Sequence, residues 1–106
     1  MNPLNTPLGF CSNFLFVPGT RSERFLKALD SGASGVILDL EDAVSVERIA
    51  IARGMVCDYL KQHPRGKQQL WVRINPLETD LALKDLTAVM PGKPDGIVLP
   101  KTLNAQ

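Results

Sequence analysis

The stretch GVILDLEDAV, at residues 35–44, determines the fold that this chain is expected to adopt. It starts as an unbroken apolar run, which is typical of a strand covered on both faces, as in a parallel sheet. Three carboxylates, Asp39, Glu41 and Asp42, then follow with no turn residue before them. Because side chains alternate along a strand, Asp39 and Glu41 share one face with Ile37. That face changes from apolar to acidic toward the carboxyl end of the strand, where parallel sheets bind their ligands.

The rest of the chain repeats a strand and a helix with short turns between them. Further apolar runs predict strands at residues 13–17, 69–75 and 96–101. Apolar residues at helical spacing predict helices at residues 20–30, 45–63 and 79–90. Strict alternation of this kind favours right-handed crossovers and a parallel sheet. The sequence therefore predicts an α/β fold, with no domain boundary inside residues 1–106.

Each predicted helix has a polar start and one apolar face. Thr20 and Glu23 have the spacing of a capping box, and Ser45 and Thr79 are the expected caps of the other two helices. The residues expected to face the core are Phe25, Leu26 and Leu29 in the first helix, Val46, Ile49, Ala52, Val56, Tyr59 and Leu60 in the second, and Leu81, Leu83, Leu86, Val89 and Met90 in the third. Glu78 and Asp85 are expected to be surface charges without a role.

The composition is that of an ordinary soluble globular protein. With a net charge of +1, the chain lacks the basic excess of a dedicated nucleic-acid binder. No apolar run approaches the roughly 20 residues that cross a bilayer, and the first residues do not resemble a signal peptide. Cys11 and Cys57 lack the spacing of a zinc site, so we expect buried free thiols rather than a disulfide. These features predict a cytoplasmic protein without nucleic-acid or membrane partners.

Polar side chains follow every predicted strand, at the ends that a parallel sheet brings to one rim. The turn at residues 18–21, with free amides at a helix start and the Arg21 guanidinium, is expected to form an anion site. Arg73 and Asn75 follow the third strand on one shared face, and Lys101 follows the fourth. Arginine grips a carboxylate bidentately, and acidic side chains hold magnesium or its waters. The rim therefore predicts a site for a small acid with a divalent cation.

Each of these residues also has a purely structural interpretation. Asp39 and Glu41 could cap helices or pair with a nearby arginine. Arg21 and Lys101 could be solvated charges at element ends. Arg73 is different, because a charged residue inside an apolar strand must be paired, either within the fold or with substrate.

Four linked motifs connect the chain to a known family. VPGTRSERF at residues 17–25, VILDLEDAV at 36–44, VRINP at 72–76 and DGIVLPK at 95–101 occur in the order and spacing of that family. The chain thus resembles the citrate lyase beta-subunit-like (CitE-like) family of the HpcH/HpaI aldolase superfamily. The resemblance implies a TIM (β/α)8 barrel, of which these (β/α) units would form the first half.

The resemblance also implies a reaction and roles for residues. Family members are magnesium-dependent lyases that split citryl-CoA or malyl-CoA into acetyl-CoA and a 2-oxo acid, or run the reverse condensation. Arg73 would bind the acid, with Arg21 near substrate or CoA. The acidic cluster Asp39, Glu41 and Asp42 would order Arg73 and the waters of the metal, and Lys101 would lie at the rim. The direct magnesium ligands are expected beyond Gln106, and relatives of this kind are commonly trimers or hexamers.

The sequence departs from the family pattern in two substitutions and in length. Ser22 stands where the family often has Pro, and Ile49 stands where a Lys is usual. A complete barrel needs roughly 250 residues, so residues 1–106 are expected to be the N-terminal half of one barrel domain, as a fragment that is inactive alone. Pairing with a second copy is the other possibility.

Two alternative functions remain open at this point. One is a magnesium-dependent aldolase that acts on free hydroxy-oxo acids without CoA. The other is a catalytically incomplete half-barrel that only assembles with itself or with a missing half.

Overall fold

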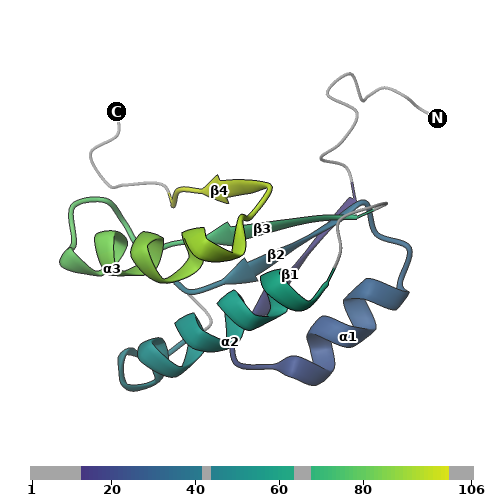
Figure 1. Cartoon of the computed structure of the whole chain (residues 1–106), viewed down its shortest axis with the longest axis horizontal. Coiled ribbons are helices and arrows are strands. Elements are labelled where there is room, and N and C mark those ends of the chain that lie inside the picture. The colour runs from purple at the N-terminus through teal and green to yellow at the C-terminus, as the bar shows by residue number, and fades with distance from the viewer. Residues whose placement is uncertain (1–12, 42–43, 64–67, 101–106) are drawn as a thin grey trace.

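The computed structural model describes residues 13–41, 44–63 and 68–100. Four strands alternate with three α-helices and two short 3-10 turns (Figure 1). The strands are β1 (Phe14–Pro18), β2 (Gly35–Asp39), β3 (Gln69–Arg73) and β4 (Gly96–Val98). The helical segments are α1 (Ser22–Asp30), η2 (Val46–Arg48), α2 (Ile49–Gln62), α3 (Asp80–Val89) and η3 (Met90–Gly92).

The four strands form one sheet in the order β1-β2-β3-β4, and every pair is parallel. Each connection carries a helix, as parallel neighbours require. The register places Asp39 between Pro18 of β1 and Arg73 of β3. The predicted α/β fold with parallel strands is therefore confirmed.

The sheet packs its helices against one face only. Alternate residues of β2 and β3, namely Val36, Leu38, Leu70 and Val72, lie in one buried cluster with residues of all three helices. The residues between them point to the opposite face. There the Phe14 and Trp71 rings pack edge to face, with 6.0 Å between the ring centroids. In Figure 1 the helices lie together on one side of the strands, so the second face carries no helix in the described part of the chain.

The helix starts differ from the prediction. Thr20 does not cap α1: the cap position is Arg21, without a side-chain hydrogen bond, and the Glu23 carboxylate pairs with Arg21. Ser45 does not cap α2 directly, because η2 intervenes and its Arg48 amide donates to the Ser45 carbonyl. Thr79 does occupy the cap position of α3, but its hydroxyl donates to the Pro76 carbonyl instead.

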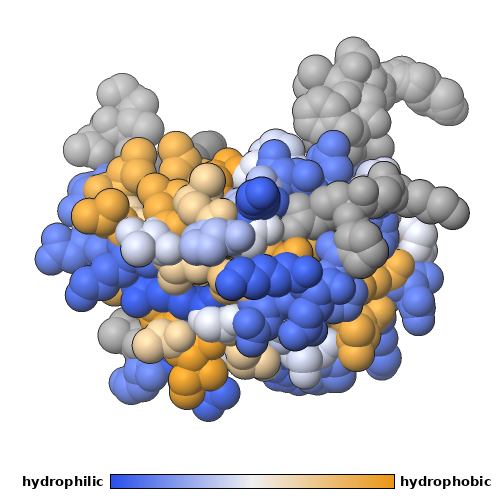
Figure 2. Space-filling view, viewed as in Figure 1, coloured by the Kyte–Doolittle hydropathy of each residue, from blue (hydrophilic) through white to orange (hydrophobic). Residues whose placement is uncertain are grey.

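Two leucines and a methionine predicted for the core are exposed. Leu26, Leu83 and Met90 reach the surface, and Leu83 is 70% exposed. Small residues replace them on the buried stripes, with Ala28 in α1 and Ala82 in α3. Exposed apolar side chains form separate patches between charged ones on the face seen in Figure 2.

Three residues singled out in the sequence cannot be placed in the fold. Asp42, Lys101 and Cys11 lie outside the described residues, and Cys57 is a free, partly buried thiol. No helix in the described ranges has the length and apolar character to cross a membrane.

Tyr59 on α2 gives a test of the core. Its ring stacks on Phe25 at 4.3 Å, while its buried hydroxyl has no hydrogen-bond partner among the described residues. Burial raises the pKa of the Tyr59 phenol above its ordinary value and outweighs the lowering by the nearby Ser22 side chain, which lies outside good hydrogen-bond geometry. A raised pKa in the folded state means that the unfolded chain loses this proton first. Stability is therefore lost as the pH rises from the ordinary tyrosine pKa of about 10 to the raised pKa of the folded state.

We predict that Tyr59→Phe raises the free energy of unfolding by about 1 kcal/mol, because it removes an unpaired buried hydroxyl. The variant also loses less stability between neutral and alkaline pH than the parent chain. Urea unfolding at several pH values measures both effects. Tyr59→Leu is the control: it removes the hydroxyl and the stacked ring together, and it should be less stable than Tyr59→Phe.

Candidate functional site

The candidate site is centred on an ion pair between the ends of β2 and β3. Arg73 donates from Nε to Asp39 Oδ1 at 3.1 Å and from Nη2 to Oδ2 at 2.6 Å. The pair is bidentate, which is the strong and directional form of this contact. The Asp39 side chain is 4% exposed, whereas that of Arg73 is 21% exposed. The guanidinium is thus fixed by a buried carboxylate and still reached by solvent.

Two further groups surround the guanidinium. Glu41 Oε1 lies 3.6 Å from Arg73 Nε, and the Glu41 amide donates to Asp39 Oδ1 at 2.8 Å. Phe16 of β1 lies below the guanidinium, with 4.7 Å between the Arg73 Cζ and the ring centroid. Three neighbouring strand ends therefore hold one arginine side chain in place. This arrangement brings together Arg73, Asp39 and Glu41 as the sequence predicted.

Asn75 does not share the surroundings of Arg73. Strand β3 ends at Arg73, so the alternation that would align the two residues stops there. The Asn75 side-chain nitrogen Nδ2 donates to Asp85 Oδ2 at 2.8 Å and to the Leu40 carbonyl at 3.1 Å. The expected shared face is therefore wrong, and the buried Asn75 belongs to an internal network.

Asp85 was the least expected member of this region. It is completely buried, and its Oδ1 accepts a hydrogen bond from Arg53 Nε at 2.7 Å. The expectation of a surface charge is wrong, because Asp85 lies on the buried face of α3 with Ala82 and Val89. The signal was present in the sequence: these residues stand three positions before and four positions after Asp85, on one helical face.

The turn after β1 was predicted to form an anion site with free backbone amides, and two of these amides are hydrogen-bonded within the fold. The Gly19 amide donates to the Asp39 carbonyl and the Arg21 amide to the Pro18 carbonyl, so these two amides are not free for an anion. The Arg21 guanidinium is exposed and pairs with Glu23. The hydrogen bond from Arg21 lowers the pKa of the Glu23 carboxyl. Arg21 is thus a surface cation at the start of α1.

The described residues do not themselves fit a magnesium ion. No group of three or more His, Cys, Asp or Glu side chains in them could hold a metal. Both oxygens of Asp39 accept hydrogen bonds from Arg73, which leaves this carboxylate poorly suited as a direct ligand. The formal charges of Asp39, Glu41 and Arg73 add up to one negative charge. This net charge would attract a divalent cation, although these side chains do not form a coordination site for it.

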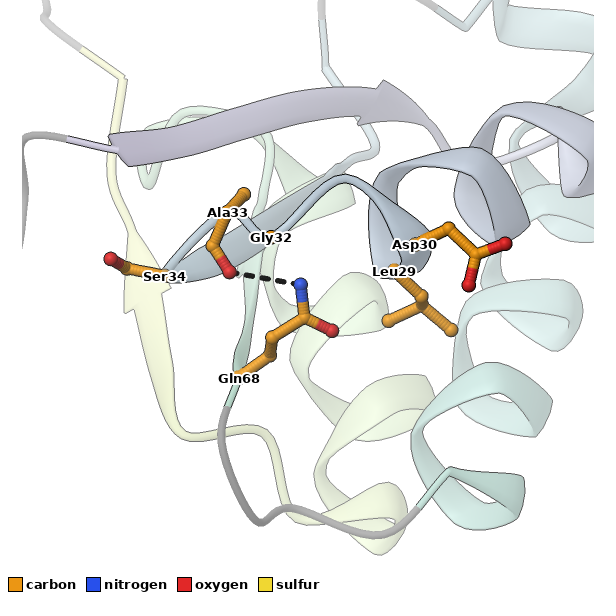
Figure 3. Close-up of a pocket in the computed structure, with 6 residues that line it drawn as sticks. All are labelled: Leu29, Asp30, Gly32, Ala33, Ser34 and Gln68. Carbon is orange, nitrogen blue, oxygen red and sulfur yellow. Dashed lines mark hydrogen bonds between the residues drawn. The ribbon is translucent and has the colours of Figure 1, made fainter.

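The cavity in Figure 3 lies elsewhere. It has a volume of about 440 Å³ and is lined by the end of α1, the turn that follows it and Gln68. The Gln68 amide bridges this turn by donating to the Ala33 carbonyl at 2.9 Å. The cavity is therefore at the amino end of β2, opposite to the end that carries Asp39, and it is separate from the candidate site.

Comparison with known proteins connects the chain to one family. Residues 13–106 match the family model described as HpcH/HpaI aldolase/citrate lyase. Citrate lyase subunit beta is 36% identical in Haemophilus influenzae and 37% identical in Escherichia coli, in each case over 89% of this chain. The (3S)-malyl-CoA thioesterase of Cereibacter sphaeroides is 33% identical over 86% of the chain. The chain spans about a third of the length of these curated relatives, 32%, 31% and 32%.

Solved structures of relatives show the same fold. CitE of Mycobacterium tuberculosis, in complex with magnesium, acetoacetate and coenzyme A, has a TM-score of 0.69 and 38% identity. This match covers 84% of the chain and 32% of CitE. The citrate lyase beta subunit of the same organism with oxaloacetate and magnesium also has a TM-score of 0.69, over 38% of its length. The family resemblance of the four motifs is thereby confirmed.

The Arg73 pair yields a stability prediction. Asp39→Asn should lower the free energy of unfolding by about 2 kcal/mol, because it removes the bidentate, charged partner of a partly buried guanidinium. Urea unfolding measures the loss. Glu23→Gln, which removes the exposed partner of Arg21, is the matched control and should leave the stability nearly unchanged. Equal losses in the two variants would contradict the assignment of Asp39 as the fixed anchor.

Proposed function

The chain belongs to the HpcH/HpaI aldolase/citrate lyase family, and from this premise we propose that it supplies the acid-binding part of a magnesium-dependent carbon–carbon lyase. The proposed substrate is a 3-hydroxyacyl-CoA of the citryl-CoA or malyl-CoA type, split into acetyl-CoA and a 2-oxo acid or formed from them. The observation that carries the proposal is the arginine of β3, held by two carboxylates at the carboxyl ends of parallel strands.

Arg73 has the proposed role of binding the carboxylate and the adjacent oxygen of the 2-oxo acid. A guanidinium fixed before the acid arrives loses little conformational freedom on binding, so the contact is stronger. Asp39 and Glu41 orient the Arg73 guanidinium. Relatives whose structures contain oxaloacetate or acetoacetate support an acid of this kind.

Magnesium belongs to the proposal because structures of relatives contain it and because the three charged side chains carry one net negative charge. A bound metal would polarise the oxygen that gains charge during cleavage. The described residues contribute the acid-binding guanidinium rather than the direct ligands. Asp42 and Lys101 lie outside the described residues, and their roles at the acidic cluster and at the rim stay predictions.

Coenzyme A favours the thioester reaction over the aldolase that acts on free acids. One solved relative contains coenzyme A together with magnesium and an oxo acid. Arg21, exposed at the start of α1, is proposed to lie near the acid or the CoA phosphates. Asn75, whose amide nitrogen is engaged inside the fold, is proposed to position this region rather than to contact substrate.

A second candidate reaction is thioester hydrolysis. It is favoured by relatives named (3S)-malyl-CoA thioesterase at 33% identity. In hydrolysis water breaks the carbon–sulfur bond and releases free CoA, whereas the lyase breaks a carbon–carbon bond and releases acetyl-CoA. The released CoA species therefore separates the two reactions.

Acid binding can be tested on the 106-residue chain by nitrogen-15 NMR. Pyruvate with magnesium chloride should shift the Arg73 Nε–H signal with a dissociation constant on the order of 1 mM, which corresponds to about 4 kcal/mol. Arg73→Lys should weaken this binding, because lysine lacks the bidentate fork. Since this variant has no Nε–H, the backbone amide signals of residues 39–41 and 73 report pyruvate binding in both the variant and the parent. Arg24→Lys, an exposed arginine on α1, is the matched control and should bind as the parent does. Unaltered pyruvate binding in Arg73→Lys would remove Arg73 from the proposal.

The reaction can be tested in a chimera in which residues 13–100 replace the matching segment of Escherichia coli citrate lyase subunit beta. The chimera should release acetyl-CoA from citryl-CoA, and its Arg73→Ala form should be slower by at least about 100-fold, as expected for losing a charged contact to the reacting acid. Chromatography of the CoA products measures both. Release of free CoA alone would favour the thioesterase instead.

A further inference from the structure

We propose that Asp85 is a positioning residue for the Arg73 site and that it acts through Asn75 and Leu40. The proposal rests on the proposed function for the chemical role of Arg73. Its structural basis is separate: a buried carboxylate of α3 determines how β3 leaves the sheet, directly after the residue that carries the guanidinium.

The first step is the hydrogen bonding of Asp85. Its Oδ1 accepts from Arg53 of α2 at 2.7 Å, and its Oδ2 accepts from both nitrogens of Asn75, each at 2.8 Å. The carboxylate is fully buried, and the Arg53 side chain is 14% exposed. A buried charge is tolerated only when it is paired and hydrogen-bonded, which these three contacts achieve. Asp85 therefore joins α2, α3 and the segment after β3.

The second step is the effect on the sheet. The Leu40 amide donates to the Arg73 carbonyl at 2.9 Å, so the next bond of a parallel ladder would run from the Asn75 amide to the Leu40 carbonyl. Asp85 accepts that backbone N–H instead. The Asn75 side chain takes its place, with Nδ2 donating to the Leu40 carbonyl at 3.1 Å. The chain thus leaves the sheet at Asn75 while Leu40 stays tied to it.

The third step connects this network to the site. Leu40 stands between Asp39 and Glu41, the two carboxylates that hold the guanidinium. Its amide is bound to the Arg73 carbonyl and its carbonyl to the Asn75 side chain. Asp85 therefore restrains the backbone on both sides of the ion pair without touching Arg73. Sub-ångström restraint of this kind decides how well a binding group is oriented.

The test follows the Arg73 Nε–H of the 106-residue chain by NMR, without ligand. Its exchange with solvent is measured at a temperature where thermal unfolding shows each variant to be folded. Asp85→Asn puts an amide where three donors need an acceptor, so exchange should become faster by about tenfold or more. Asp58→Asn, which neutralises an exposed carboxylate of α2, is the matched control and should leave the exchange unchanged.

A purely structural role of Asp85 would lower the unfolding temperature and leave the exchange and chemical shift of the Arg73 Nε–H unchanged in the folded chain, and this result overturns the proposal. If Asp85→Asn does not fold, Asn75→Ala decides on the same signal. It removes the Nδ2 bond to Leu40 and should accelerate the exchange severalfold, whereas no change again overturns the proposal.

A second measurement separates this proposal from the proposed function. Pyruvate with magnesium chloride should bind the Asp85→Asn variant about tenfold more weakly than the parent chain. If the parent chain itself shows no pyruvate effect at Arg73, the proposed function fails. The ligand-free exchange measurement still decides whether Asp85 positions the arginine.

Discussion

The register between β2 and β3 is the constraint on which the rest of the structure depends. Asp39 pairs with Arg73 because Leu38 pairs with Val72, and the latter two face the helices. A slip by one residue would turn Arg73 into the apolar core and bring leucine to the open face. Burial of the helix-covered face therefore excludes a one-residue slip, and in the observed register the arginine meets its carboxylate. Folding and assembly of the site are the same event.

Two charged clusters flank the ends of these strands, and they differ in access to solvent. Arg73, held by Asp39 and Glu41, has a side chain that is 21% exposed, so solvent reaches the guanidinium while its two carboxylate partners stay in place. In the second cluster Asp85 is fully buried between α2, α3 and the segment after β3, and the Arg53 side chain is 14% exposed. In a medium of low polarity such a pair has few alternative arrangements, which makes it a rigid support. One cluster is therefore suited to binding and the other to holding the binding group in place.

The family relationship gives these clusters their chemical meaning. The chain spans about a third of the length of its curated relatives. That third contains the strand ends with Arg73 and the acidic stretch. The single net negative charge of Arg73, Asp39 and Glu41 favours a cation near this end of the sheet, in agreement with the proposed function. The ion pair lies on the face of the sheet that carries no helix in the described residues, together with the Phe14 and Trp71 rings.

The sequence by itself determined the order of strands and helices and the meeting of Arg73 with Asp39 and Glu41. Both follow from local periodicity, because a period of two assigns faces and parallel strands bring like ends together. The spacing of Ala82, Asp85 and Val89 indicated one face of α3, but only the tertiary structure decided that this face is buried and that Leu26 and Leu83 lie outside. The contact that makes Asp85 tolerable comes from Arg53, 32 residues earlier in the chain. Local patterns carry no information about such a partner, since only packing of α2 against α3 brings the two charges into reach.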